Sequence, residues 1–180
     1  MIRQMPGSVY ADSSCAQPMI EPPNELRSRL IELVRSSATL MRALRAARAA
    51  DPPDWLIGGG VIRDLVWDHL HDPRRESIPK DIDLAFFDPA SLGDDRERSV
   101  LDALRAQAPD IPWDVKNQAA VHLWYPQAFG VEVEPLVSSA DGVATWPETA
   151  TTVAVRLLAD DTIEVVATHP RAHARRHRRT

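Results

Sequence analysis

The chain has 180 residues, of which 44% are hydrophobic and 26% are charged, a composition typical of a globular protein. This length is enough for one domain with a substantial core and too short for two domains of ordinary size. The single cysteine, Cys15, excludes an internal disulfide and a cysteine-based zinc site. The sequence contains no apolar run of about 18 residues and no signal-peptide-like start, so we expect a cytoplasmic protein without a membrane span.

The net charge of −5 is unevenly distributed along the chain. Residues 171–180 contain five arginines and no acidic residue, which leaves about −10 on the rest of the chain. An acidic body disfavours general nucleic-acid binding, because phosphate backbones need a basic face. We expect residues 1–22 and the basic tail 169–180 to be disordered, and residues 23–168 to form the domain.

The apolar pattern of residues 24–50 predicts one amphipathic helix. Leucine, valine and methionine recur there at three- and four-residue spacings. Asp51-Pro52-Pro53 would end this helix, because the residue before a proline is disfavoured in the helical region. The apolar run Trp55-Leu56-Ile57 then predicts a short buried strand.

Three glycines, Gly58, Gly59 and Gly60, follow this strand and begin a second predicted helix. They allow the backbone to turn sharply and to approach a ligand closely. The N-terminal amides of the helix, with its dipole behind them, would form an anion site suited to a triphosphate. The apolar residues expected to face the core from this helix are Val61, Ile62, Leu65, Val66 and Leu70.

Two aspartates, Asp81 and Asp83, lie at the start of the apolar run 82–87, which predicts a strand. Side chains alternate between the faces of a strand, so the two carboxylates should point the same way. Like charges fixed side by side repel each other unless a cation lies between them. Divalent ions such as Mg²⁺ prefer such oxygen ligands, usually together with a substrate phosphate.

Residues 94–107 predict a further helix, and residues 113–118 predict a third strand. Trp113 and Val115 would share one face of that strand, and Asp114 would lie on the other. Asp114 is therefore our candidate for a third carboxylate near the first two.

Two alternatives for the third carboxylate are Glu132 and Glu134, which also alternate with valines. His122 stands alone in an apolar setting, where a structural role is more typical than a ligand role. Residues 153–166 predict a closing hairpin, from which Arg156 would point either toward the site or toward solvent.

Three basic side chains would offset phosphate charge: Arg63, Lys80 and Lys116. Arg63 lies in the first turn after the glycines, although a surface ion pair with Asp64 is an alternative. Lys116 begins a run of polar side chains with Asn117 and Gln118, which is more polar than a merely structural strand requires.

A strand, a glycine turn, a helix and Asp-x-Asp on the next strand resemble the DNA polymerase β-type nucleotidyltransferase superfamily. This resemblance rests on Gly59, Gly60, Asp81 and Asp83. The Arg63-Asp64 pair is similar to the version in CCA-adding enzymes and bacterial poly(A) polymerases. Further segments resemble a small bacterial group of nucleotidyltransferase family proteins: PKDIDLAFFDP, DVKNQAAVHLW and SSADGVATWPETATTVAVRL.

The resemblance covers residues 24–167 and implies an α/β (α+β) nucleotidyltransferase fold, a mixed β-sheet flanked by helices. It implies transfer of a nucleoside monophosphate from an NTP to an acceptor hydroxyl, with release of pyrophosphate. Asp81, Asp83 and Asp114 would hold two Mg²⁺ or Mn²⁺ ions, or Asp114 would act as a general base. Residues 58–60 and the three basic side chains would orient the phosphates.

Two other functions fit the same sequence. One is a catalytically silent nucleotide-binding or regulatory module of the same fold. The other is a partner- or RNA-binding protein that works through the arginine-rich tail. Three retained carboxylates favour the enzyme, because a binding module needs no second metal. The acceptor could be a small molecule, a protein side chain or RNA.

Overall fold

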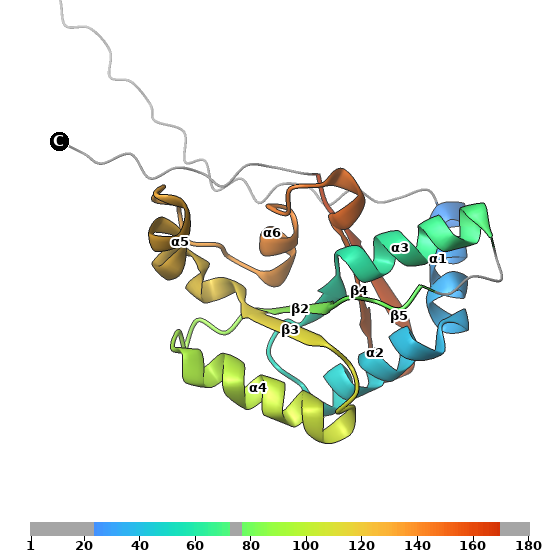
Figure 1. Ribbon diagram of the computed structural model, residues 1–180, viewed down its shortest axis with the longest axis horizontal. Helices are drawn as coiled ribbons and strands as arrows, with labels where there is room; N and C mark the ends of the chain where they lie inside the picture. The colour runs from blue at the N-terminus through green and yellow to red at the C-terminus, as the bar shows by residue number, and fades with distance from the viewer. Residues whose placement is uncertain (1–23, 73–76, 170–180) are drawn as a thin grey trace, which may run out of the picture.

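The computed structural model describes residues 24–72 and 77–169, which form a five-stranded mixed sheet flanked by helices (Figure 1). The strands are β1 (Leu56–Gly58), β2 (Ile82–Phe86), β3 (Trp113–Asn117), β4 (Val153–Leu157) and β5 (Ile163–Ala167). The helices are α1 (Asn24–Ser36), α2 (Ala38–Ala50), α3 (Gly60–His71), α4 (Asp94–Gln107), α5 (Val121–Phe129) and α6 (Ser139–Val143), with 3₁₀ turns η1 (Gln118–Ala120) and η2 (Thr149–Thr151). The predictions of disorder for residues 1–22 and for the arginines of the tail concern residues outside this description.

The strand order is β3-β2-β1-β4-β5. β1 is central and runs antiparallel to both β2 and β4, whereas β2 and β3 are parallel. β4 and β5 form the antiparallel hairpin that the sequence predicted. The mixed sheet and its flanking helices confirm the predicted fold class. None of the helices in the described ranges has the length and apolar character needed to cross a membrane.

The main core lies on one face of the sheet, where α1, α2, α3 and α4 supply apolar side chains. Ile57, Leu84 and Val155, neighbours across β1, β2 and β4, contribute from the sheet. The opposite face has a much smaller cluster beneath α6: Leu56, Ala85, Val143, Ala154 and Val166, with Trp146 packed against it. The side chains of Asp83 and its partner Asp114 belong to this second face.

The single helix predicted for residues 24–50 is wrong, because the chain breaks at Ser37 into α1 and α2. The Ser37 hydroxyl accepts a hydrogen bond from the Leu40 amide at 3.2 Å and caps α2. A serine that bonds the backbone in this way competes with continuation of the preceding helix. The predicted stop is confirmed, since α2 ends at Ala50 and Asp51 adopts a left-handed conformation.

The prediction for the inward face of α3 is correct for three of its five residues. Ile62 is buried, and Val61 and Leu65 pack against the main core. Val66 and Leu70, which is 66% exposed, instead line an open apolar groove of about 420 Å³ with Trp67 of α3 and residues of α1.

Candidate active site

The parallel pairing of β2 with β3 brings three carboxylates to one face of the sheet. Asp83 and Asp114 are direct partners in the register. Asp81 precedes Asp83 by two residues and therefore lies on the same face of an extended chain. Leu84 and Val115, also register partners, point into the main core instead.

Asp83 is the most enclosed of the three, while Asp81 and Asp114 are exposed. Burial, and then the negative charges of Asp81 and Asp114, raise the pKa of Asp83 to about 6. Loss of hydration disfavours the ionised form of a carboxyl, and nearby negative charge disfavours it further. The three side chains therefore interact electrostatically as one acidic group.

The glycine turn lies against this group from the β1 side, because Gly58 is the register partner of Asp83. Gly59 has φ +73°, and a Cβ there would lie 2.6 Å from Asp83 Oδ2. Position 58 favours glycine for a different reason, because a Cβ there would lie 2.7 Å from Ala154 Cβ on β4. Gly60, the first residue of α3, is less confined, because the nearest atom to a Cβ there is Arg63 Nη2 at 3.8 Å. The turn thus places the start of α3 against a carboxylate.

Arg63 lies in the first turn of α3 and is held by two acidic side chains. Its Nε donates to Asp64 Oδ1 at 2.8 Å, and its Nη1 donates to Glu148 Oε2 at 2.8 Å. Hydrogen bonds to Asp64 and Glu148, together with their charges, raise the pKa of Arg63 further above its usual value. The predicted Arg63-Asp64 ion pair is therefore present, and Nη2 lies 3.8 Å from the position of a Cβ on Gly60.

Comparison with known proteins identifies the family. Residues 45–174, more than half of the chain, match the family model described as nucleotidyltransferase. The chain belongs to the nucleotidyltransferase family. It is also similar to a solved structure described as revealing a CCA-adding enzyme head domain, with 28% identity and a TM-score of 0.62 over 77% of this chain and 69% of that chain. No curated protein matches the chain with comparable significance.

The two predicted lysines of the nucleotidyltransferase lie in different surroundings. Lys80 is exposed and directly precedes Asp81. Lys116 projects from β3, where its Nζ lies 3.6 Å from Glu97 Oε2 and 3.9 Å from Asp114 Oδ1. Lys116 therefore connects the acidic group to the first turn of α4.

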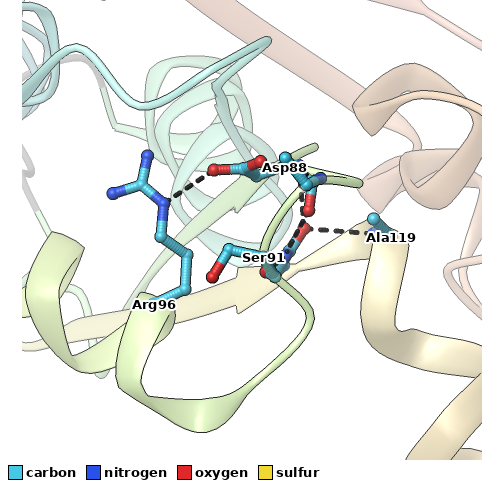
Figure 2. A network of polar contacts seen from close by, with 6 residues as sticks. Asp88, Ser91, Arg96 and Ala119 are labelled. Carbon is cyan, nitrogen blue, oxygen red and sulfur yellow. Dashed lines mark hydrogen bonds and ion pairs between the residues drawn. The ribbon is translucent and has the colours of Figure 1, made fainter.

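The sequence did not reveal the structural role of Asn117, whose side chain connects the end of β3 to the segment after β2. Asp88, Ser91 and Ala119, which it contacts, lie close together in Figure 2. The Asn117 side chain is buried, accepting from the Asp88 and Ala119 amides and donating to the Asp88 and Ser91 carbonyls at 2.9–3.2 Å. Its own amide donates to Glu97 Oε1 at 2.8 Å. The polar run at 116–118 thus combines the exposed Lys116 with the buried Asn117, whose set of hydrogen bonds we call the Asn117 clamp. An asparagine at the end of a predicted strand is the signal that could have indicated this.

The alternative site residues come from other parts of the chain. Glu132 and Glu134 flank an isolated bridge at Val133 rather than a strand, and neither is among the charges that shift the pKa of Asp83. Arg156 is paired with Glu164 at 2.5 Å and lies 3.6 Å from Asp54.

His122 has a buried Nδ1 with no hydrogen-bond partner within the described part of the chain. Its predicted structural role therefore lacks the expected hydrogen bond at that nitrogen.

The carboxylates share a face without meeting at one point. Among residues 24–72 and 77–169, no three His, Cys, Asp or Glu side chains converge closely enough to form a ready-made metal site. Three ionised carboxylates repel each other, so their separation is the arrangement expected of the side chains by themselves. Their oxygen donors are nevertheless of the type that Mg²⁺ and Mn²⁺ prefer.

Proposed function

We propose that this nucleotidyltransferase transfers a nucleoside monophosphate from an NTP to an acceptor hydroxyl and releases pyrophosphate, with Mg²⁺ or Mn²⁺ held by Asp81, Asp83 and Asp114. The acceptor oxygen forms a bond to the α-phosphorus as the bond from that phosphorus to the bridging oxygen breaks. The hydroxyl proton leaves toward Asp114, the carboxylate on the β3 side.

One observation supports this proposal most directly: the pairing of Asp83 with Asp114 beside Asp81, and the raised pKa that results. A fold has little reason to keep a half-buried carboxylate next to two others if all remain uncompensated, because the repulsion destabilises the folded state. A bound divalent ion would convert that repulsion into attraction.

The donor set fits the metal that the family implies. Carboxylate oxygens with open sides leave room for phosphate oxygens and water, which is the usual environment of Mg²⁺ in phosphoryl-transfer sites. Bound divalent ions supply Lewis-acid stabilisation of the phosphate oxygens and lower the pKa of a coordinated hydroxyl.

Residues of the chain itself would bind and orient the triphosphate. The start of α3 at Gly59 and Gly60 presents backbone amides and the positive end of the helix dipole. Arg63, above this turn, would exchange its contact with the exposed Glu148 for a phosphate oxygen. Lys80 would add positive charge on the Asp81 side. Positioning and electrostatic stabilisation account for most of phosphoryl-transfer catalysis.

The test uses α-³²P-labelled NTPs with Mn²⁺ or Mg²⁺ and a panel of hydroxyl acceptors, with pyrophosphate release measured in parallel. We expect label transfer and pyrophosphate release that depend on the divalent ion. NTP binding without pyrophosphate release for any acceptor would instead establish the catalytically silent module and contradict the proposal.

A further inference from the structure

A cavity of about 610 Å³ opens on the outer side of β3. It lies between the first turn of α4, where Asp94 and Glu97 line it, and α5, where Leu123 and Trp124 line it. Lys116 of β3 forms part of the wall, and its Nζ lies 3.9 Å from Asp114 Oδ1. The cavity is therefore linked through Lys116 to Asp114, the carboxylate on the strand that does not pair with β1.

The order of the glycine turn, the carboxylates and the cavity across the sheet indicates which reactant each would bind. Gly58 on β1, Asp83 on β2 and Asp114 on β3 are aligned by the register, and the cavity lies two residues farther along β3, where Lys116 lines it. Neighbouring strands are about 4.8 Å apart, so the row from β1 to β3 is about 10 Å long, which leaves room for a reacting phosphate between the glycine turn and β3. Nucleotidyl transfer requires the attacking and leaving oxygens to lie roughly in line. With pyrophosphate at the glycine turn, the attacking hydroxyl comes from the β3 side.

The size and rigidity of the cavity suit a small molecule. A volume of about 610 Å³ lies in the range of roughly 300–1,000 Å³ that is typical of small-molecule sites. Asn117 connects β3 to the loop before α4 through the Ser91 carbonyl, and Glu97 accepts a hydrogen bond from the Asn117 amide, so the Glu97 side of the acidic wall is held in place. Such a preformed site binds without first ordering its own side chains.

The charge of the lining favours a cation. Asp94 and Glu97 are the acidic side chains of the wall, and Asp114 lies just beyond it. The single ammonium, that of Lys116, is shared between Glu97 and Asp114 at 3.6 and 3.9 Å. An RNA end would bring phosphates against these carboxylates, whereas a protonated amine would be attracted. Trp124, which is 39% exposed, offers an aromatic surface for a cation or a sugar ring.

We propose that this cavity is the acceptor site of the enzyme and that the acceptor is a small, positively charged, hydroxyl-bearing molecule. This inference rests on the proposed function. Its amine contacts the acidic wall, its ring packs on Trp124, and its hydroxyl faces Asp114. This geometry disfavours a nucleic-acid 3′ end as acceptor.

Binding is tested on the full chain without metal or NTP, by titration with three probes in ¹H–¹⁵N NMR. The probes are glucosamine, its uncharged relative N-acetylglucosamine, and a short single-stranded RNA with a free 3′ hydroxyl. We expect glucosamine to shift the Trp124 indole and the amides of residues 92–97 and 120–127, and the other two probes to leave these signals in place. Equal shifts with N-acetylglucosamine, or shifts of these signals with the RNA, would overturn the proposal.

Two pairs of variants keep the test specific. Asp94→Asn should weaken glucosamine binding about two- to fivefold, while Asp95→Asn, one residue away and paired with Arg98 instead, should not. Trp124→Ala should weaken it about three- to tenfold, while Trp67→Ala, on the groove between α1 and α3, should not. Matching effects in the two members of a pair would contradict the assignment.

Label transfer from α-³²P-NTP in the presence of Mn²⁺ separates this inference from the proposed function. Transfer to the amino sugar and not to the RNA supports both. Transfer to the RNA alone overturns the acceptor assignment and leaves the nucleotidyl-transfer proposal standing. No pyrophosphate release with any acceptor, despite NTP binding, overturns the proposed function and the acceptor assignment with it.

Discussion

The two faces of β2 differ in a way that separates stability from chemistry. Ile82, Leu84 and Phe86 point into the main core and are almost completely buried. On the alternate positions, Asp81 and Asp83 share the face of β2 that carries Ala85 of the small cluster beneath α6. One strand of five residues, with the aspartate before it, thus supplies both a well-packed layer and a group of mutually repelling carboxylates.

The difference shows how the fold tolerates the acidic face. Burial of large apolar side chains on the core face contributes about 1.5–3 kcal/mol for each side chain. Together these contributions exceed the cost of the repulsion between the carboxylates on the other face. Substitutions on the core face should therefore change the free energy of unfolding. Those on the acidic face should change activity, with little loss of stability or even a gain.

The largest effect should come from Asp83→Asn. Replacing the enclosed carboxylate with an amide removes a negative donor from the centre of the site, so nucleotidyl transfer should fall at least about a thousandfold. Label transfer and circular dichroism, compared with Asp102→Asn on the exposed side of α4, separate chemistry from folding. Retention of more than a tenth of the activity would contradict the assigned role.

On the opposite face, Leu84→Ala should destabilise the protein by about 2–5 kcal/mol, because it leaves a cavity in the main core. Leu84 is 1% exposed. Urea unfolding measures the change, and Leu70→Ala provides a matched control because Leu70 is largely exposed. Equal effects of the two substitutions would show that the faces are not as different as the burial indicates.

At the glycine turn, a single substitution should affect both stability and activity. Gly59→Ala should cost about 1–3 kcal/mol of stability, because its φ of +73° is disfavoured for alanine. The new methyl group would also press on Asp83 Oδ2 and displace it, so activity should fall as well. Gly60→Ala is the matched control for stability, since a Cβ there would be in ordinary contact with Arg63 Nη2 at 3.8 Å and the position begins a helix. Similar losses in both variants would remove the special role of the Gly59 conformation.

Much of this division could be predicted from the sequence. Alternation of Ile82, Leu84 and Phe86 with Asp81 and Asp83 is a period-two pattern, which indicates a strand with one core face. The same alternation in residues 113–117 predicted which side of β3 carries Asp114, although the parallel pairing that aligns it with Asp83 is a property of the whole sheet.

Other features depend on contacts that one sequence does not reveal. The break at Ser37 follows from a single side-chain hydrogen bond that interrupts a continuous helical pattern. Glu148 lies 85 residues from Arg63, and its ion pair depends on how η2 packs against α3. The clamp at Asn117 likewise required the loop after β2 to return to the end of β3.

The smallest effect concerns pH, and it measures the repulsion itself. The Asp83 carboxyl has a pKa of about 6 in the folded protein against 3.8 ordinarily, so the folded state holds this proton more tightly. Well below pH 3.8 the group is protonated in both states. As pH rises from about 4 to about 6, the carboxyl ionises in the unfolded state while the folded state still holds the proton. Stability therefore falls across this range, by about 1–2 kcal/mol once solvent screening is allowed for, and the loss is complete above pH 6.

Urea unfolding of the wild type and Asp83→Asn in EDTA, between pH 4 and pH 7.5, isolates this contribution. The variant should lack the loss of stability between about pH 4 and pH 6 and should be the more stable protein at pH 7.5. Mg²⁺ should stabilise the wild type at pH 7.5 and have little effect near pH 4.5, because a protonated carboxyl is a poor ligand. Parallel pH profiles for the two proteins would mean that the pKa of Asp83 is not raised in the folded state. Repulsion among the carboxylates would then no longer support cation binding at this face.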